Sequence, residues 1–239
     1  MNSQQGKNLK NSFKDILMSR IFSGQLQPGD KLPPERELAE QLGFSRGSVN
    51  QGILDLERVG LIKVVPRKGA YVADYMRTAT AETLSAIMSY DSTVFAPKLF
   101  QDLMELRILV ERDSARLACK RVSASTRAIL SEQINAIYCA SEDEIGDRLY
   151  SFHKSITQLS GNAAYTIVFQ SFEKMLSNLI KAHYSNRDEL RRCLPLYDKL
   201  AAAISRGDAT EADAVLLSIL GRASDYISTM LEIKAGKCL

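Results

Sequence analysis

The spacing of apolar residues divides the first 60 residues into three short helical segments. Within each segment, apolar side chains recur every three or four positions, as on a helix with one buried face. Glycines end the segments, at Gly24, Gly43 and Gly60. Pro34 begins the second segment and Ser45 the third, and both are favourable residues at a helix start. The pattern therefore predicts three short helices joined by turns.

A different period follows the third helix. Residues 61–65 (LIKVV) and 70–73 (AYVA) form two short runs rich in β-branched residues. Residues 66–69 (PRKG) join them and combine two turn-forming residues with two cations. The two runs are therefore expected to pair as a β-hairpin with a basic tip.

Strand patterns nearly vanish from residue 78 onward. Pro97, Gly161 and Gly207 fall between helical segments and mark their ends. Seven helices are predicted near residues 78–92, 98–121, 124–140, 143–160, 163–184, 187–206 and 208–235. The predicted fold class is therefore mainly α, with three helices and a hairpin followed by an all-α bundle of six or seven helices.

The charge distribution follows the same division. The chain of 239 residues holds 31 Lys and Arg against 28 Asp and Glu. Residues 1–77 hold 12 of these cations and 8 of the anions, a net charge of +4, which leaves −1 for the rest. We predict a basic first domain over 1–77, a linker with the first helix of the second domain over 78–100, and a near-neutral helical domain over 101–239.

The four cysteines exclude several classes of protein. Cys119, Cys139, Cys193 and Cys238 are far apart and form no CxxC pair, which argues against a zinc knuckle, a redox motif or a disulfide framework. The N-terminal residues lack the apolar core of a signal peptide, and no run of about 18 apolar residues occurs. A cytoplasmic protein without a membrane segment is expected.

Three short helices followed by a basic-tipped hairpin is the order of a winged helix-turn-helix. In that arrangement the third helix enters the DNA major groove by its N-terminal end, and the wing contacts the backbone or the minor groove. Arg46 can donate two hydrogen bonds to a guanine, while Ser45, Ser48 and the first N–H groups of the helix suit phosphate oxygens. The first domain is therefore predicted to bind double-stranded DNA.

The stretch GQLQPGDKLPPERELAEQLGFSRGSVNQGILDLERVGLIKVVPRKGAYVA resembles the GntR family of bacterial transcription regulators. The resemblance implies that Arg36 reaches DNA together with Arg46 and that Gly69 lets the wing approach the groove. Asn50 stands where the family usually has an arginine, which indicates an unusual operator. The predicted DNA-binding residues are Arg36, Ser45, Arg46, Ser48, Asn50, Lys68 and Gly69.

Three later segments, LMELRILVERDSARLACKR, SFHKSITQLSGNAAY and LYDKLAAAISRGDATEADAVLLSIL, resemble the FCD effector-binding domain of the FadR subfamily. Many FCD domains hold a metal through an aspartate and three histidines. Carried over by position, this chain keeps His153 but has Leu149, Tyr197 and Ile219 at the other three positions. We therefore expect no metal cofactor, because the chain contains only two histidines.

The resemblance also points to an effector pocket. Arg107 matches an arginine that faces this pocket in the family, and a buried arginine needs an anionic partner. That partner is either Glu111, one helical turn later, or an anionic, organic-acid-like effector, which we favour. His153 is either a hydrogen-bonded core residue or part of the pocket. The candidate effector-binding residues are Arg107, His153, Asn162 and Tyr197.

The sequence thus predicts a ligand-responsive regulator that binds a short palindromic operator as a homodimer. An alternative is a DNA-binding architectural or dimerisation protein whose effector pocket is vestigial. Enzymatic activity is not expected, because no GxSxG, HExxH, phosphate-loop or paired-carboxylate motif occurs.

Overall fold

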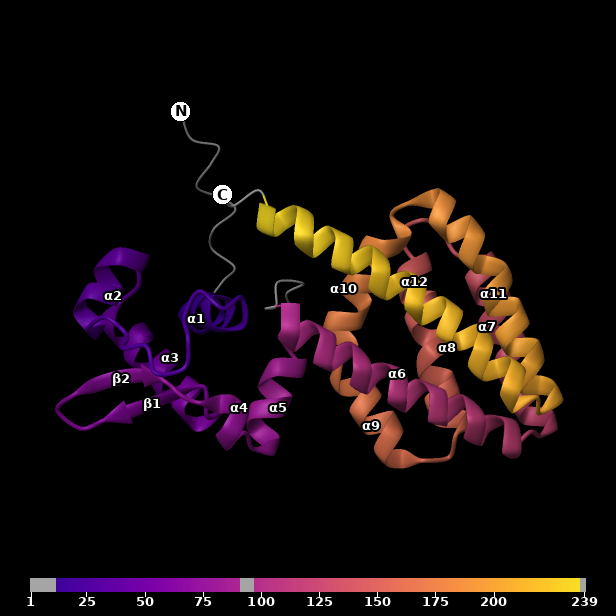
Figure 1. Ribbon diagram of the computed structural model, residues 1–239, viewed down its shortest axis with the longest axis horizontal. Helices are drawn as coiled ribbons and strands as arrows, with labels where there is room; N and C mark the ends of the chain where they lie inside the picture. The colour runs from indigo at the N-terminus through magenta and orange to yellow at the C-terminus, as the bar shows by residue number, and fades with distance from the viewer. Residues whose placement is uncertain (1–11, 91–96, 237–239) are drawn as a thin grey trace. The chain divides into compact units, whose positions relative to one another are not determined.

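The chain forms two compact units, Met1–Ala96 and Pro97–Leu239 (Figure 1). The computed structural model describes the backbone of residues 12–90 and 97–236, and their side chains except those of Pro97 and 227–236. These residues contain helices and one two-stranded antiparallel hairpin, so the predicted mainly α fold class is confirmed. Cys238 lies outside the described residues.

The first unit is built around its third helix. Its elements are α1 (Phe13–Phe22), α2 (Glu35–Leu42), α3 (Arg46–Arg58), β1 (Ile62–Val65), β2 (Gly69–Val72), α4 (Tyr75–Thr78) and α5 (Ala81–Met88). Both α1 and α2 pack against α3. Gly52 permits the close approach of α1, since a Cβ atom there would lie 2.5 Å from the ring of Phe13. The three predicted helices are therefore present and share one core.

The hairpin pairs Ile62 with Val72 and Val65 with Gly69. A third segment lies along its second strand, because the Leu32 N–H donates to the Ala70 carbonyl and Lys31 bridges to Tyr71. The turn before α2 is thereby fixed against the wing.

The helix predicted near 78–92 is present as α5, over Ala81–Met88, and is shorter than predicted. The chain leaves helical geometry at Ala79, and Thr80 and Thr83 then form a capping box that starts α5 as a separate helix. The ring of Tyr90 lies 5.1 Å from that of Phe22, so this segment packs with the first unit. Residues 91–96 of the predicted linker lie outside the described residues, and the functional domain limits remain a prediction.

The second unit consists of packed helices. They are α6 (Pro97–Lys120), α7 (Ala124–Tyr138), α8 (Ile145–Leu159), α9 (Ala163–Ser171), α10 (Glu173–Tyr184), α11 (Arg187–Arg206) and α12 (Ala209–Gly236). Helix α8 packs against α6, α7, α9 and α10, and α12 packs along α6 and α11 (Figure 1). None of the described helices has both the length and the apolar character of a membrane span.

The single helix predicted over 163–184 is wrong, because the structure divides it into α9 and α10. Phe172 adopts φ −85° and ψ 0°, which ends the first helix and starts the second. Its side chain is almost fully buried, and no glycine or proline marks the break. Core packing therefore places this break without a local sequence signal.

Candidate DNA interface and effector pocket

The N-terminus of α3 is ordered by two serines. The Ser48 N–H donates to Ser45 Oγ at 3.1 Å, and the two hydroxyl oxygens lie 2.9 Å apart. Arg46, between them, is exposed and forms no hydrogen bond or ion pair with the described residues. The cap thus satisfies the Ser48 N–H group and leaves the Arg46 guanidinium available to an external acceptor.

The start of α2 lies beside the second turn of α3. Asn50 Nδ2 donates to Glu35 Oε1 at 3.0 Å, and this contact joins the two helices. Arg36 is highly exposed and forms a 3.0 Å ion pair with Glu40, one turn later. An exposed pair of this kind is weak, so Arg36 can exchange it for a phosphate. Sequence reasoning missed Glu35, whose pairing with Asn50 depends on how the helices pack.

The wing presents Arg67 and Lys68 at its tip, both exposed. Arg67 has a positive φ of 63°, and Gly69 has φ 112°, a backbone conformation that side chains disfavour. Lys31 Nζ lies 5.9 Å above the ring of Tyr71, which adds a further cation beside the hairpin. The sequence could suggest Arg67 by adjacency, but only the pairing of residues 29–32 with β2 identifies Lys31.

A buried chain of polar side chains crosses the second unit. Arg107 Nε donates to Glu111 Oε1 at 2.6 Å, and His153 Nδ1 lies 2.5 Å from Glu111 Oε2. His153 Nε2 lies 3.1 Å from the hydroxyl of Tyr197, which lies 3.0 Å from that of Tyr184. All five side chains are at least about nine-tenths buried. Of the candidate effector-binding residues, the structure therefore brings together Arg107, His153 and Tyr197.

Glu111 carries the negative charge of this cluster. Burial by itself would raise the pKa of Glu111, but the charges and hydrogen bonds of His153 and Arg107 outweigh it and lower the pKa to about 2. An ionised carboxylate only accepts hydrogen bonds, so Nδ1 of His153 carries a proton. Glu111 therefore supplies the anionic partner that Arg107 requires.

The space at this cluster is small. A cavity lined by Arg107, His153, His183, Tyr184 and Tyr197 offers about 10 Å³, enough for at most one water molecule. Asn162 is not among its lining residues; its side chain accepts from the Ala164 N–H and caps α9. The described conformation has no room for an organic acid.

The donor atoms at His153 do not fit a transition metal. Leu149, one turn before it, is fully buried and apolar, and Ile219 lines the same cavity. Both ring nitrogens of His153 already lie within hydrogen-bond distance of Glu111 or Tyr197. The Arg107 guanidinium in the same cluster would repel a cation. No metal chemistry is assigned to this position.

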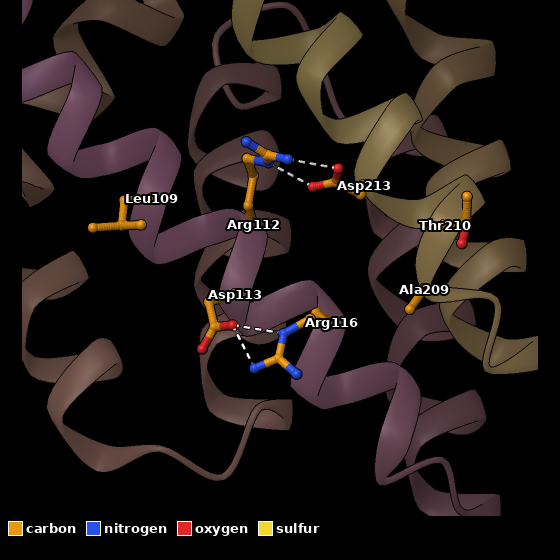
Figure 2. Close-up of a pocket in the computed structure, with 7 residues that line it drawn as sticks. All are labelled: Leu109, Arg112, Asp113, Arg116, Ala209, Thr210 and Asp213. Atoms are coloured by element: carbon orange, nitrogen blue, oxygen red, sulfur yellow. Dashed lines mark hydrogen bonds and ion pairs between the residues drawn. The ribbon is translucent and has the colours of Figure 1, made fainter.

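A larger groove of about 430 Å³ lies between α6 and α12 (Figure 2). Arg112 forms two hydrogen bonds with Asp213, at 2.6 and 2.7 Å, and Arg116 pairs with Asp113. Its charged side chains thus neutralise one another, and the groove is shallow and open. Among the described residues that line it, no charged side chain is left unpaired.

A winged helix-turn-helix joined to a helical module with a buried polar centre defines a class of two-part regulatory proteins. The family model described as "Bacterial regulatory proteins, gntR family" matches residues 9–72, and the FCD domain model matches residues 102–222. The chain belongs to the GntR family of bacterial regulatory proteins and carries an FCD domain, so it is a transcription regulator by family and not an enzyme.

Named relatives agree with this assignment, and a solved structure shares the fold. The Glc operon transcriptional activator of Escherichia coli K12 is 29% identical to this chain over 173 residues. The matched region covers 70% of this chain and 66% of the activator, just under two thirds of the activator's length. The transcriptional regulator LutR of Bacillus subtilis is 24% identical over 219 residues, 89% and 98% of the two chains. The structure of Lar, which controls expression of the Listeria monocytogenes agr system, shares the fold with a TM-score of 0.54, 18% identity and coverage of 91% and 95%.

Proposed function

We propose that this regulator acts in the cytoplasm as a homodimer that binds a short palindromic DNA operator. The observation that carries the proposal is Arg46, exposed and unpaired among the described residues at the capped N-terminus of α3. One good base contact contributes about 1 to 3 kcal/mol of discrimination between the correct base pair and a wrong one. A single small DNA-binding domain with a few such contacts is therefore poorly specific. A dimer presents two copies to a two-fold symmetric site and roughly doubles that discrimination.

The proposed DNA contacts have distinct roles. Arg46 and Asn50 read base edges, while Arg36, Ser45, Ser48 and Lys68 contact phosphates, and Gly69 allows close approach of the wing. Protection of a discrete site by the full chain in a footprint of the DNA flanking its gene is the direct test. Failure to retard any such fragment at low salt would contradict DNA binding.

Lys68→Ala is expected to weaken binding to all DNA sequences by a similar factor. Each lost phosphate contact reduces the slope of log affinity against log salt by about 0.9, so a dimer loses about 1.8. The measurement is fluorescence anisotropy with operator and non-operator DNA between low and physiological salt. Lys63→Ala, on the same hairpin, is the control and should keep the wild-type slope. If Lys68→Ala and the wild type have equal slopes of log affinity against log salt, Lys68 does not contact a DNA phosphate.

We further propose that an anionic, organic-acid-like effector regulates the dimer from the pocket at Arg107. Such an effector would take the place of Glu111 on the guanidinium and open the cavity at His153 and Tyr197. Asn162, on the separate α8–α9 corner, is the weakest of the candidate residues. In this proposal the effector favours one relative placement of the two DNA-binding domains of the dimer. Its effect on DNA affinity can be no larger than the difference in effector affinity between the two placements.

A second candidate function is supported by the same cluster. Arg107 already has Glu111 as its partner, and the cavity holds at most one water molecule. These contacts favour a DNA-bound dimerisation protein with a vestigial pocket. In both cases we propose that the family's metal position, with Leu149 and Ile219 in place of ligands, holds no metal.

A thermal-shift series with mono- and dicarboxylic acids distinguishes the two candidates. If the protein is an effector-responsive regulator, one acid should raise its melting temperature and change its operator affinity, because the acid binds the folded state alone. Arg107→Met should lose this response, and Arg112→Met, an exposed arginine on the same helix, should keep it. If no acid changes either quantity in the wild type, the dimerisation protein is the better description.

A further inference from the structure

A second group of metal-binding side chains lies at the junction of α10 and α11. His183 is in the last turn of α10, while Glu189 and Cys193 are one turn apart on α11. One ligand atom from each residue lies within 4.8 Å of those from the other two. These residues are not the ones at which the family's metal ligands are expected.

His183 is the unusual member of this group. Its side chain is 1% exposed, and neither ring nitrogen has a hydrogen-bond partner in the described part of the chain. Leaving such a nitrogen unpaired inside a protein costs about 1 to 3 kcal/mol. The other histidine, His153, is equally buried but has partners for both nitrogens. The unpaired imidazole beside Glu189 and Cys193 therefore indicates a ligand that it would bind.

The ring of His183 is held in a fixed position. It packs edge-on against the rings of Tyr184 and Tyr226, with centroids 4.5 and 4.8 Å away. Burial lowers its pKa, which keeps the imidazole in the neutral form that binds metals. Cys193 is fully buried, with its sulfur 3.6 Å from Glu189 Oε1. The histidine is thus preorganised, and the other two donors lie together.

We propose that His183, Glu189 and Cys193 bind a divalent transition metal ion of the zinc type. A nitrogen, an oxygen and a sulfur donor together suit zinc, whereas calcium and magnesium require oxygen ligands. With bonds of about 2.0 to 2.3 Å, tetrahedral ligand atoms lie roughly 3.3 to 3.8 Å apart. The sulfur of Cys193 already lies 3.6 Å from Glu189 Oε1, so binding requires only that separations of up to 4.8 Å shorten by about 1 Å. The fourth position is filled by water or another small ligand.

Binding at this site releases a proton and displaces an arginine. The Cys193 thiol gives its proton to solvent as the metal–sulfur bond forms, so the thiolate and the Glu189 carboxylate balance the two charges of the ion. Arg222 Nε currently donates to Glu189 Oε1 at 2.8 Å and must release that oxygen. The Arg222 side chain is 40% exposed, so it can turn to water. Arg222 thus competes with the metal for Glu189.

Cobalt titration tests the site directly. The full-length protein, purified without an affinity metal and treated with a chelator, should bind one Co²⁺ per chain and develop a sulfur-to-cobalt charge-transfer band that excess Zn²⁺ removes. About one proton per ion should be released in weakly buffered solution. Absence of the band, or a stoichiometry near zero, in the wild type overturns the proposal.

Matched variants assign the ligands. Cys193→Ser should lose the band, and His183→Gln should weaken binding by more than the roughly 10- to 100-fold typical of residues next to a ligand. Cys139→Ser, which removes an exposed thiol, should leave the titration unchanged. Loss of the band in Cys139→Ser but not in Cys193→Ser overturns the proposal.

Arg222→Gln provides a test that does not depend on the buried variants remaining folded. Removing the competing guanidinium should tighten cobalt binding by about 10-fold or more, because it exposes the Glu189 carboxylate and removes a nearby positive charge. Unchanged or weaker binding in this variant contradicts Glu189 as a ligand.

Discussion

Arg46→Ala is expected to reduce operator affinity by about 30-fold to 10⁴-fold. A bidentate arginine–guanine contact contributes about 1 to 3 kcal/mol, and a dimer loses two of them, or about 2 to 6 kcal/mol. Ser45 and Ser48 fix the helix start from which Arg46 projects, so the guanidinium is well placed for such a contact. Fluorescence anisotropy at one salt concentration, with operator and scrambled DNA, measures the loss. Scrambled DNA should show a much smaller change.

Two variants show whether Arg46 reads a base. Arg58→Ala removes an exposed arginine from the opposite end of α3 and should bind the operator like the wild type. Arg46→Lys keeps the charge but loses the two-pronged donor geometry, so it should recover little of the lost discrimination. Full recovery by lysine would instead assign Arg46 to a phosphate.

Glu111→Gln is expected to lower the free energy of unfolding of the second unit by about 3 to 5 kcal/mol at pH 7. The substitution leaves the Arg107 charge buried without an anionic partner, and breaking a buried ion pair from one side has a cost of this size. It also removes the charged acceptor of the His153 N–H. Calorimetry and urea unfolding followed by circular dichroism measure the change.

The loss should depend on pH. Because the pKa of Glu111 in the folded protein is about 2, below its ordinary value of 4.5, the ionised carboxylate stabilises the fold fully above pH 4.5. That contribution disappears as the pH falls from 4.5 toward 2. The stability difference between wild type and Glu111→Gln should therefore shrink over this interval.

Asp213→Asn is the control for Glu111→Gln. It breaks the exposed pair between Arg112 and Asp213 and should change stability by no more than about 1 kcal/mol. The double variant Arg107→Met with Glu111→Leu removes both buried charges and should recover much of the loss. A similar effect of Glu111→Gln and Asp213→Asn would mean that the buried cluster does not stabilise the fold.

The DNA-binding domain was largely predictable because its signals are local. Ser45 at the start of α3, Gly43 before it and Gly60 after it each act within a few residues of their own position. The hairpin tip likewise follows from residues 66–69. Asn50 was predicted as a DNA contact, but its hydrogen bond to Glu35 was not, because that bond joins residues 15 positions apart.

The helical second unit was less predictable. The sequence left open whether Glu111 or an effector neutralises Arg107. In the structure, Glu111 Oε1 lies 2.6 Å from Arg107 Nε. The break at Phe172 had no glycine or proline to announce it. The sequence did not indicate a role for His183, because its closeness to Glu189 and Cys193 depends on how α10 packs against α11.

The sequence by itself determined the secondary structure of residues 12–72, the helical character of the described residues that follow the hairpin, and the family of the protein. These follow from spacings of a few residues and from motifs in a fixed order. Only the tertiary structure decided which buried charges pair, how little space remains at Arg107, and that His183 has no hydrogen-bond partner among the described residues. Those properties depend on the rotation and separation of packed helices, where a shift of about 1 Å makes or breaks a hydrogen bond.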